Sequence, residues 1–181
     1  MPNIPEELRL CLKDGQWPFD YIDQNREIVR AIVLDGAGRY YFTRVERNDD
    51  FGTLCTIETA GGGVEPGEDL RTAIQRELRE ELGASVEILC SIGTVEDDYN
   101  LVHRHNINHY FLCRATAFGE KALTQEEAEC LHLSTLQLTY EEAVREYQRC
   151  ADTKLGRLLA ARELPVLHRA KELTDLLAEE G

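Results

Sequence analysis

The sequence predicts an α/β (α+β) fold in which helices sandwich a mixed β-sheet, with a helical extension at the C-terminal end. Runs rich in β-branched residues recur between residues 26 and 138, and amphipathic helical patterns cover 68–82 and most of the chain after residue 139. The chain has 181 residues, a length that suits one domain with a modest appendage. We therefore expect an N-terminal extension over 1–25, a central domain over 26–150 and a C-terminal helical extension over 151–181.

The first predicted elements are a short helix and a β-hairpin. Residues 1–25 are mixed in character, and a short helix is expected around Pro5–Lys13. Arg26–Leu34 and Arg39–Val45 are both rich in β-branched and aromatic residues, and the glycine-containing segment 35–38 separates them. The two runs therefore predict strands joined as a hairpin.

A glycine-rich turn leads into the most regular helical pattern of the chain. Leu54–Ala60 is expected to be a strand that enters this turn at Gly61-Gly62-Gly63. Glu68–Leu82 has the spacing of an amphipathic helix, and Gly83 is its expected C-terminal stop. Three later strands are expected over Val86–Val95, Asn108–Phe118 and Leu131–Leu138, with a polar loop over Glu96–Asn106 between the first two. A helix capped by Thr139 is expected over Tyr140–Cys150. The tail over Thr153–Ala178 is expected to be rich in helix and to be interrupted by Pro165.

The charge composition excludes some classes of partner. Twenty Lys and Arg residues stand against thirty-four Asp and Glu residues, which gives a formal net charge of -14. Nucleic-acid polymers and anionic membranes attract basic surfaces, so neither is expected as a partner. No apolar run approaches the ~20 residues that span a bilayer, the N-terminus lacks the features of a secretory signal, and the six cysteines are scattered without a metal-binding spacing. These features together predict a cytoplasmic protein with free thiols.

Three carboxylates gather on one side of the predicted helix. Glu77, Glu80 and Glu81 have i, i+3 and i+4 spacing and fall partly within the apolar arc that should face the core, whereas Arg76 and Arg79 are expected to point away from them. Spacing alone leaves two interpretations. The carboxylates are the solvated face of a helix in an acidic protein, or they hold a divalent cation, for which oxygen ligands favour Mg²⁺ or Mn²⁺. The glycine-rich turn favours the second, because glycines let the backbone approach a ligand closely, as in phosphate-binding loops.

The segment Gly62–Ala84, GGVEPGEDLRTAIQRELREELGA, resembles the Nudix box, G-x5-E-x7-R-E-U-x-E-E-x-G-U. Every fixed position matches, and Ala84 stands where the Nudix family usually has a larger aliphatic residue. The order of the strands between residues 26 and 150 is similar to the α/β/α sandwich of that family. The two extensions have no family-wide counterpart.

The resemblance implies a metal-dependent hydrolase that cleaves a nucleoside diphosphate linked to another moiety, with Mg²⁺ or Mn²⁺ as its cofactor. It implies that Glu77, Glu80 and Glu81 are metal ligands. The backbone carbonyl of Gly61 or Gly62 would join them.

The resemblance also implies catalytic roles. Glu80 counts among the catalytic residues, Arg76 would orient a catalytic glutamate, and Glu68 would support the start of the helix and the metal shell. A general base, or a further metal ligand, is expected from a loop after the box. Glu127 is favoured for this role, and Glu126 comes next.

The substrate is less clearly indicated. Ile57–Gly62 resembles the entry to the box in ADP-ribose and nucleotide-sugar hydrolases, but Thr59 stands where that branch often has proline. A nucleoside triphosphate pyrophosphatase and a non-catalytic nucleotide-sensing module therefore stay open beside an ADP-ribose-like or nucleotide-sugar substrate. We expect a small-molecule partner, and the resemblance is compatible with a homodimer. The candidate substrate contacts are Glu68, Gly62, Gly63, Arg44, Arg47, Tyr99, His103, Arg104 and His105.

Overall fold

Eight strands form one mixed sheet in the computed structural model, which describes residues 5–179. Their spatial order is β1-β6-β7-β2-β3-β4, with β5 paired to β2 and β8 paired to β3. β2 runs parallel to β7, whereas β6 and β7 form a long antiparallel pair. The strands are β1 (Leu8–Leu12), β2 (Gln24–Leu34), β3 (Tyr40–Asp49), β4 (Gly52–Glu58), β5 (Ala60–Gly63), β6 (Ala84–Tyr99), β7 (Arg104–Phe118) and β8 (Ser134–Leu138).

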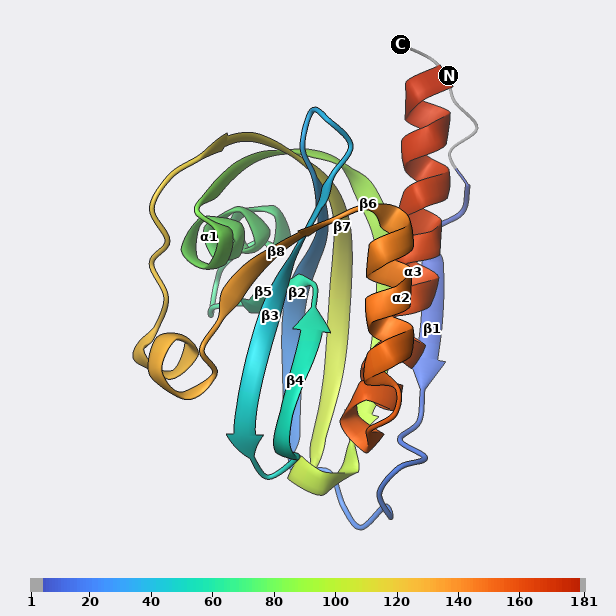
Figure 1. Ribbon diagram of the computed structural model, residues 1–181. Coiled ribbons are helices and arrows are strands. Elements are labelled where there is room, and N and C mark those ends of the chain that lie inside the picture. The colour runs from blue at the N-terminus through green and yellow to red at the C-terminus, as the bar shows by residue number, and fades with distance from the viewer. Residues whose placement is uncertain (1–4, 180–181) are drawn as a thin grey trace.

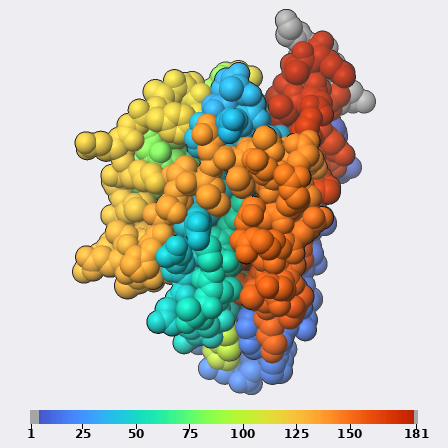
Figure 2. All heavy atoms as spheres, viewed as in Figure 1, coloured from blue at the N-terminus to red at the C-terminus, as the bar shows by residue number. Residues whose placement is uncertain are grey.

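Helices cover both faces of this sheet (Figure 1). α1 (Leu70–Leu82) packs on one face, and α2 (Tyr140–Cys150) and α3 (Lys154–Glu179) lie side by side on the other, where Figure 2 shows them in orange and red. Alternation along β2 divides the core in two, because Val29 packs with α1 whereas Ile32 packs with α2 and α3. The predicted sandwich of helices around a mixed sheet is confirmed.

The ends of α1 and α2 agree with the sequence signals. Asp69 caps α1 by accepting the backbone N–H of Thr72 at 3.0 Å, and Gly83 ends that helix in the left-handed conformation that glycine tolerates. Thr139 caps α2, and Glu142 returns a hydrogen bond to the cap, which is a complete capping box. Local chemistry therefore sets the position of α1, the helix that carries the carboxylates.

β1 replaces the short helix that was expected around Pro5–Lys13, and this expectation was wrong. The leucines at 8, 10 and 12 pack against the core while Arg9 and Cys11 are exposed, which is the two-residue period of a strand. β1 pairs with β6 in parallel, and a Cβ atom at Gly93 of β6 would clash with the Leu8 carbonyl oxygen. The pairing is with a distant segment, so the local sequence carries little signal for it.

Two more segments differ from expectation. Gly61–Gly63 belong to strand β5, antiparallel to β2, and do not form the expected turn. Glycine has no side chain to alternate between faces, so the pattern of a strand is invisible here. β6 and β7 also extend through most of the polar loop expected at Glu96–Asn106 and leave a one-turn helix at Asn100–Val102. Asn106 Nδ2 donates to Asp97 Oδ1 at 3.2 Å, which satisfies polar groups inside this longer hairpin.

α3 continues through Pro165 without the expected interruption. Proline inside a helix costs about 3 kcal/mol or more. Its neighbours Glu163, Val166 and Leu167 are all buried, and this packing outweighs the cost. Within residues 5–179, no helix is both long enough and apolar enough to cross a membrane.

α3 also carries a buried network of charged and polar groups. Arg162 and Glu163 are both 0% exposed and form an ion pair at 2.8 Å. Arg162 Nη1 donates to Asp97 Oδ2 at 3.1 Å and to the Tyr99 hydroxyl oxygen at 2.8 Å. The Glu163 carboxylate accepts a hydrogen bond from the Thr59 hydroxyl at 3.0 Å. Thr59, which stands where ADP-ribose and nucleotide-sugar hydrolases often have proline, therefore has a structural partner in this fold. We call this set the α3 network: Arg162, Glu163, Asp97, Tyr99, Thr59 and Tyr110, whose hydroxyl also donates to Glu163.

Candidate functional site

A cavity of about 890 Å³ opens between α1, the sheet and the start of α3. α1 and β5 form one wall, the first half of β2 and the ends of β3, β6 and β7 form the floor, and residues 122–133 close one side. Figure 2 shows this last segment, in yellow to orange, bulging away from the body of the protein at the left. The cavity thus gathers side chains from most of the chain.

α1 buries two of its three carboxylates. The helix packs its apolar side on the sheet, and Glu77 and Glu81 stand at the margin of that side with only 7% exposure each. Glu81 Oε2 accepts the backbone N–H of Gly61 at 2.9 Å. Burial, followed by repulsion from Glu77 and Glu127, raises the pKa of Glu81 to about 8. The cost of burying this charge is therefore not met by the hydrogen bond alone.

Glu77 lies against β5. Burial raises the pKa of Glu77, although Arg76 partly offsets the effect. A Cβ atom at Gly62 would lie 2.5 Å from Glu77 Oε2, so any side chain there would displace the carboxylate. Gly62 is thus needed for the close approach of strand and helix, whereas the sequence suggested that the glycines let the backbone approach a ligand.

Arg76 points into the carboxylate cluster, and the expectation that it points away was wrong. Its guanidinium forms ion pairs with Glu68 at 2.8 Å, with Glu77 at 2.7 Å and with Glu80 at 3.3 Å, and it donates to the Gly63 carbonyl at 3.0 Å. A long side chain can fold back along its helix and reach neighbours that a wheel diagram places elsewhere. The hydrogen bond from Arg76 is the main cause that lowers the pKa of Glu68 to about 2.

The donor set of this cluster suits a hard divalent cation. In the described part of the chain, no three His, Cys, Asp or Glu side chains already converge as a finished metal centre. Glu81 is nevertheless a buried carboxylate with no ion pair among residues 5–179, and Glu77 and Glu80 share a single arginine. An oxygen-only group with this shortage of positive charge fits Mg²⁺ or Mn²⁺.

The two glutamates expected from a later loop also line the cavity. They stand in a short helix, Glu126–Cys130, that follows β7 in the chain. Glu127 Oε2 accepts the Thr124 backbone N–H at 2.8 Å, which orients its carboxylate. Its charge contributes to the raised pKa values of Glu77 and Glu81, so the structure brings Glu127 to the α1 carboxylates.

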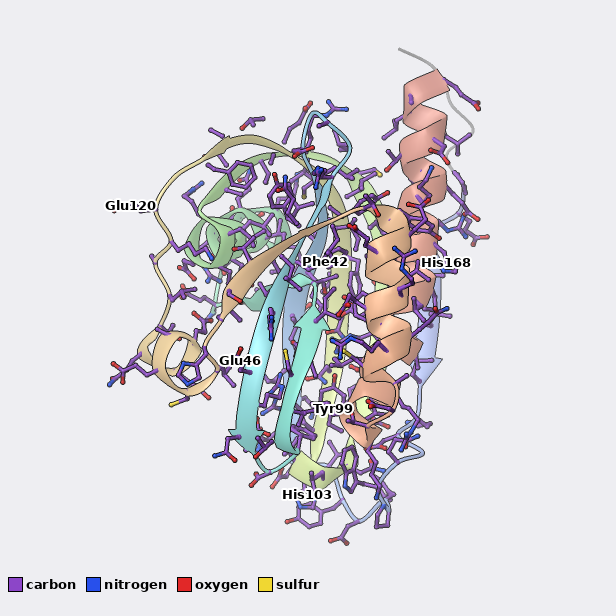
Figure 3. The ribbon with its side chains drawn as sticks, viewed as in Figure 1. Phe42, Glu46, Tyr99, His103, Glu120 and His168 are labelled. Carbon is purple, nitrogen blue, oxygen red and sulfur yellow. The ribbon has the colours of Figure 1, made fainter. Side chains whose placement is uncertain are left out.

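The candidate substrate contacts separate into two groups. Gly62, Gly63, Tyr99, Arg104 and Arg47 line the cavity, as do Glu77, Glu80 and Glu81. Tyr99 is buried beside α3, and His103 lies beyond it at the tip of the hairpin (Figure 3). The hydroxyl of Tyr99 is engaged by the α3 network, so its ring alone faces the cavity.

Four candidates lie outside the cavity, which corrects their assignment. The Glu68 carboxylate accepts two hydrogen bonds from Arg76. Arg44 is exposed and pairs with Glu46, because Thr43, Val45 and Arg47 take the cavity face of β3 and the alternate residues face away. The other two are occupied elsewhere: the ring of His103 stacks on Tyr21 at 4.0 Å, and His105 Nδ1 contacts Asp98 at 2.6 Å.

Sequence reasoning missed several cavity residues. Arg26 and Arg30 on β2 face the cavity, and so do Phe51 and two leucines of α3, Leu155 and Leu159. The sequence contains a signal for the two arginines. Arg26 and Arg30 alternate with Glu27 and Val29, so they lie on one face of a strand that is otherwise mostly apolar. The α3 leucines had none, since only tertiary packing brings them to the cavity.

Comparison with known proteins places the chain in a family. The model of the NUDIX domain matches residues 24–152. The chain is 44% identical over 62 residues to an RNA pyrophosphohydrolase of Dinoroseobacter shibae, which is 34% of this chain and 36% of that protein. It is 32% identical over 65 residues to an uncharacterized Nudix hydrolase of Nostoc sp., which is 36% of this chain and 38% of that protein. The chain thus matches little more than a third of the length of these relatives.

Solved structures share the fold. A NUDIX hydrolase from Nitrosomonas europaea superposes with a TM-score of 0.60 at 16% identity and covers 84% of this chain and 89% of its own. The ORF135 protein of E. coli gives a TM-score of 0.55 at 24% identity, over 83% and 91% of the two chains. The family model spans well over half of the sequence and includes α1, β5 and the carboxylates, and on that ground the chain belongs to the NUDIX family.

Proposed function

We propose that this chain is a metal-dependent hydrolase that cleaves the pyrophosphate of a nucleoside diphosphate linked to another moiety. The observation that carries the proposal is the buried, underneutralised pair Glu77 and Glu81 beside β5, in a cavity that also contains arginines. Such a site needs a cation to be stable in its ionised form. A cation at that place is also what an acidic protein needs in order to hold an anionic diphosphate.

Glu77, Glu80 and Glu81 would hold Mg²⁺ or Mn²⁺, with a backbone carbonyl of Gly61 or Gly62. When bound, such a cation neutralises phosphate charge and lowers the pKa of a water molecule. The ion pairs of Arg76 with Glu77 and Glu80 fix the directions of these carboxylates before any ligand arrives.

Glu127 is the proposed general base, and Glu126 is its nearest alternative. The oxygen of a water molecule attacks one phosphorus, the bridging P–O bond breaks, and Glu127 takes the proton of the water. The bond from the Thr124 N–H holds the Glu127 carboxylate toward the cavity. The departing phosphate oxygen keeps the electrons of the broken bond.

A nucleoside triphosphate or a 5′-triphosphate end is the second candidate substrate class. The relative from Dinoroseobacter shibae bears the name RNA pyrophosphohydrolase, and the matched segment is 44% identical. An ADP-ribose-like or nucleotide-sugar substrate has the support of Ile57–Gly62, with Thr59 in place of proline. A homodimer and a cytoplasmic location stay predictions.

The test is product analysis by ion-exchange chromatography in the presence of Mg²⁺. The panel is ADP-ribose, several nucleotide sugars, normal and oxidised nucleoside triphosphates, diadenosine polyphosphates and a 5′-triphosphorylated RNA oligonucleotide. We expect turnover of at least one diphosphate-linked compound, with a nucleoside monophosphate as one product. Turnover of triphosphates alone would support the second class. The absence of turnover on the whole panel would contradict catalysis and leave the nucleotide-sensing module.

A further inference from the structure

Five arginines line the cavity, and three of them form hydrogen bonds or ion pairs with the protein, although Nε of Arg47 has no partner within residues 5–179. Arg76 binds the α1 carboxylates, Arg47 pairs with Glu58 at 2.6 Å, and Arg30 donates to Asn108 and to the Thr59 carbonyl. The remaining two are different. Within residues 5–179, neither Arg26 nor Arg104 forms a side-chain hydrogen bond or an ion pair, although each faces a cavity rich in carboxylates.

β-sheet pairing places these two arginines together. β2 and β7 run parallel with Arg26 opposite Asn106, so Arg104 lies one strand across and two residues earlier on the same face. Arg26 Nη2 is 3.1 Å from the Cβ position of Gly63, which puts this guanidinium beside β5. Arg104 Nε is buried and has no hydrogen-bond partner in the described part of the chain.

Their charges are not balanced by the protein. Burial, and then repulsion from Arg104 and Arg30, lowers the pKa of Arg26. Glu77 and Glu126 act in the opposite direction, but neither lies close enough to Arg26 for an ion pair. Although the sequence has thirty-four acidic residues, the described part of the chain thus leaves two neighbouring guanidinium groups without a carboxylate partner. Guanidinium groups in that state suit a phosphate, which they can bind through two parallel hydrogen bonds.

The wall beyond Arg104 is apolar. Arg104 is the register partner of Tyr99, whose ring packs against Phe51 at a centroid distance of 5.9 Å and against Leu155 and Leu159 of α3. Arg26 thus lies beside β5 and its neighbouring α1 carboxylates, and Arg104 lies beside the apolar wall, where Arg47 and Asp49 also line the cavity near Phe51. A nucleotide has the same order of chemistry, with a charged phosphate attached to a planar, largely apolar base.

We propose that Arg26 and Arg104 form an anion subsite that holds the nucleoside-bearing phosphate of the substrate, with the nucleoside directed toward Phe51, Leu155 and Leu159. This proposal rests on the proposed function but adds a site that does not involve the metal. It assigns the pair to the phosphate that stays on the nucleoside after cleavage. The monophosphate product should therefore bind without any divalent cation.

The first experiment measures binding to the full chain by isothermal titration calorimetry in EDTA. The probes are 5′-AMP, 5′-GMP and inorganic phosphate, and the variants are Arg26→Gln and Arg104→Gln. Arg114→Gln is the matched control, because Arg114 is an exposed arginine on the same strand as Arg104. We expect a nucleoside monophosphate to bind wild type, each cavity variant to bind it about tenfold or more weakly, and the control to be unchanged.

The outcomes separate the sources of affinity. Inorganic phosphate that binds with the same dependence on Arg26 and Arg104 would support the anion subsite, and a stronger affinity for the nucleotide would support the direction of the nucleoside. Nucleotide affinity that is the same in wild type and both variants would overturn the proposal, and so would a wild type that binds none of the three probes. Arg104→Lys keeps the charge without the planar fork, so we expect intermediate affinity. Unchanged circular dichroism would show that the variants fold.

A second experiment uses whichever substrate the panel identifies. We expect Arg104→Gln to raise KM about tenfold or more while kcat stays within a few-fold, because the phosphate contact is the same in substrate and transition state. A fall in kcat with KM unchanged would overturn the positioning of the phosphate by Arg104. Should no panel compound be cleaved, the calorimetric result still decides the subsite, so failure of the proposed function and failure of this inference are distinguishable.

Discussion

The α3 network and the carboxylates of α1 both bury charge, and they do so in opposite ways. The α3 network buries Arg162 and Glu163 completely, but every charge in it faces an opposite charge or a hydroxyl group. The α1 cluster, which consists of Glu77, Glu80 and Glu81, buries Glu77 and Glu81 almost as deeply. Within residues 5–179, Glu77 shares Arg76 with Glu80, and Glu81 accepts one backbone N–H without an ion pair. The first region is complete within the protein, and the second has a deficit of positive charge.

This difference distinguishes a region with a structural role from a region that binds a ligand. A buried ion pair with all its hydrogen bonds made holds its elements in register and needs no ligand. Buried carboxylates without a cation have raised pKa values and gain from binding one. Arg26 and Arg104 are the opposite case, because within residues 5–179 these cavity cations have no carboxylate partner. The functional site is therefore distinguished by buried charges that the protein does not neutralise, because burial of charge is common to both regions.

Glu80→Gln tests the functional side of this comparison and should give the largest effect. The substitution removes one negative charge from the α1 cluster, so we expect kcat to fall about a thousandfold or more. The Glu80 side chain is 35% exposed, so the fold should survive. Steady-state kinetics with Mg²⁺ measure the loss, and Glu87→Gln, an exposed glutamate on β6, is the control. Activity near that of wild type would mean that the metal assignment is wrong.

Arg162→Met tests the structural side. It leaves Glu163 and Asp97 buried without their cation, so the free energy of unfolding should fall by about 3–5 kcal/mol. Urea denaturation measures this change. Arg169→Met on the same helix is the control, since Arg169 is half-buried, its partner Glu172 is exposed, and the pair should contribute no more than about 1 kcal/mol. An equal decrease in the free energy of unfolding of the two variants would show that the α3 network stabilises the fold no more than an ordinary surface ion pair does.

Glu81→Gln sharpens the contrast through pH. The pKa of Glu81 is about 8 in the folded chain against 4.5 as the ordinary value, so its stabilising contribution is complete below pH 4.5 and is lost as the pH rises through 8. Without metal, the glutamine variant should therefore be more stable than wild type at pH 8. The gain should be a few kcal/mol, because a tenfold difference between the two acid dissociation constants corresponds to about 1.4 kcal/mol.

Unfolding midpoints in EDTA at pH 5 and pH 8 measure this effect. Saturating Mg²⁺ should restore much of the wild-type stability at pH 8 and should stabilise the variant less. If wild type in EDTA were as stable at pH 8 as the variant, the α1 cluster would be satisfied without a cation, and the comparison would fail.

Tyr99→Phe should have the smallest effect. It removes the hydroxyl oxygen that accepts one of the hydrogen bonds of Arg162 and keeps the ring. We therefore expect the free energy of unfolding to fall by about 1 kcal/mol. KM should stay within twofold of wild type, because the hydroxyl belongs to the α3 network and only the ring faces the cavity. A large rise in KM with unchanged stability would indicate that the Tyr99 hydroxyl contacts the substrate.

The sequence predicted the parts of this structure that depend on neighbours along the chain. α1 was readable because its apolar spacing, its carboxylates and Gly83 all lie within one segment. β5 was not readable, because glycines carry no pattern and its partner β2 lies about thirty residues earlier. The pairing of Arg26 with the region of Arg104 and the contact of Arg162 with Asp97 join residues far apart in the chain. Only the packing of the sheet and α3 determines them.

The subsite of Arg26 and Arg104 has a consequence for the rate of encounter. The whole chain carries a net charge of -14, so an approaching polyphosphate is repelled over distances comparable with the Debye length, about 8 Å at physiological salt. Attraction by the two arginines begins only at the cavity. Association should therefore accelerate as salt is added, opposite to the usual behaviour of phosphate-binding proteins. The nucleotide would arrive most rapidly as its magnesium complex, because that complex carries less negative charge through the repulsive outer field.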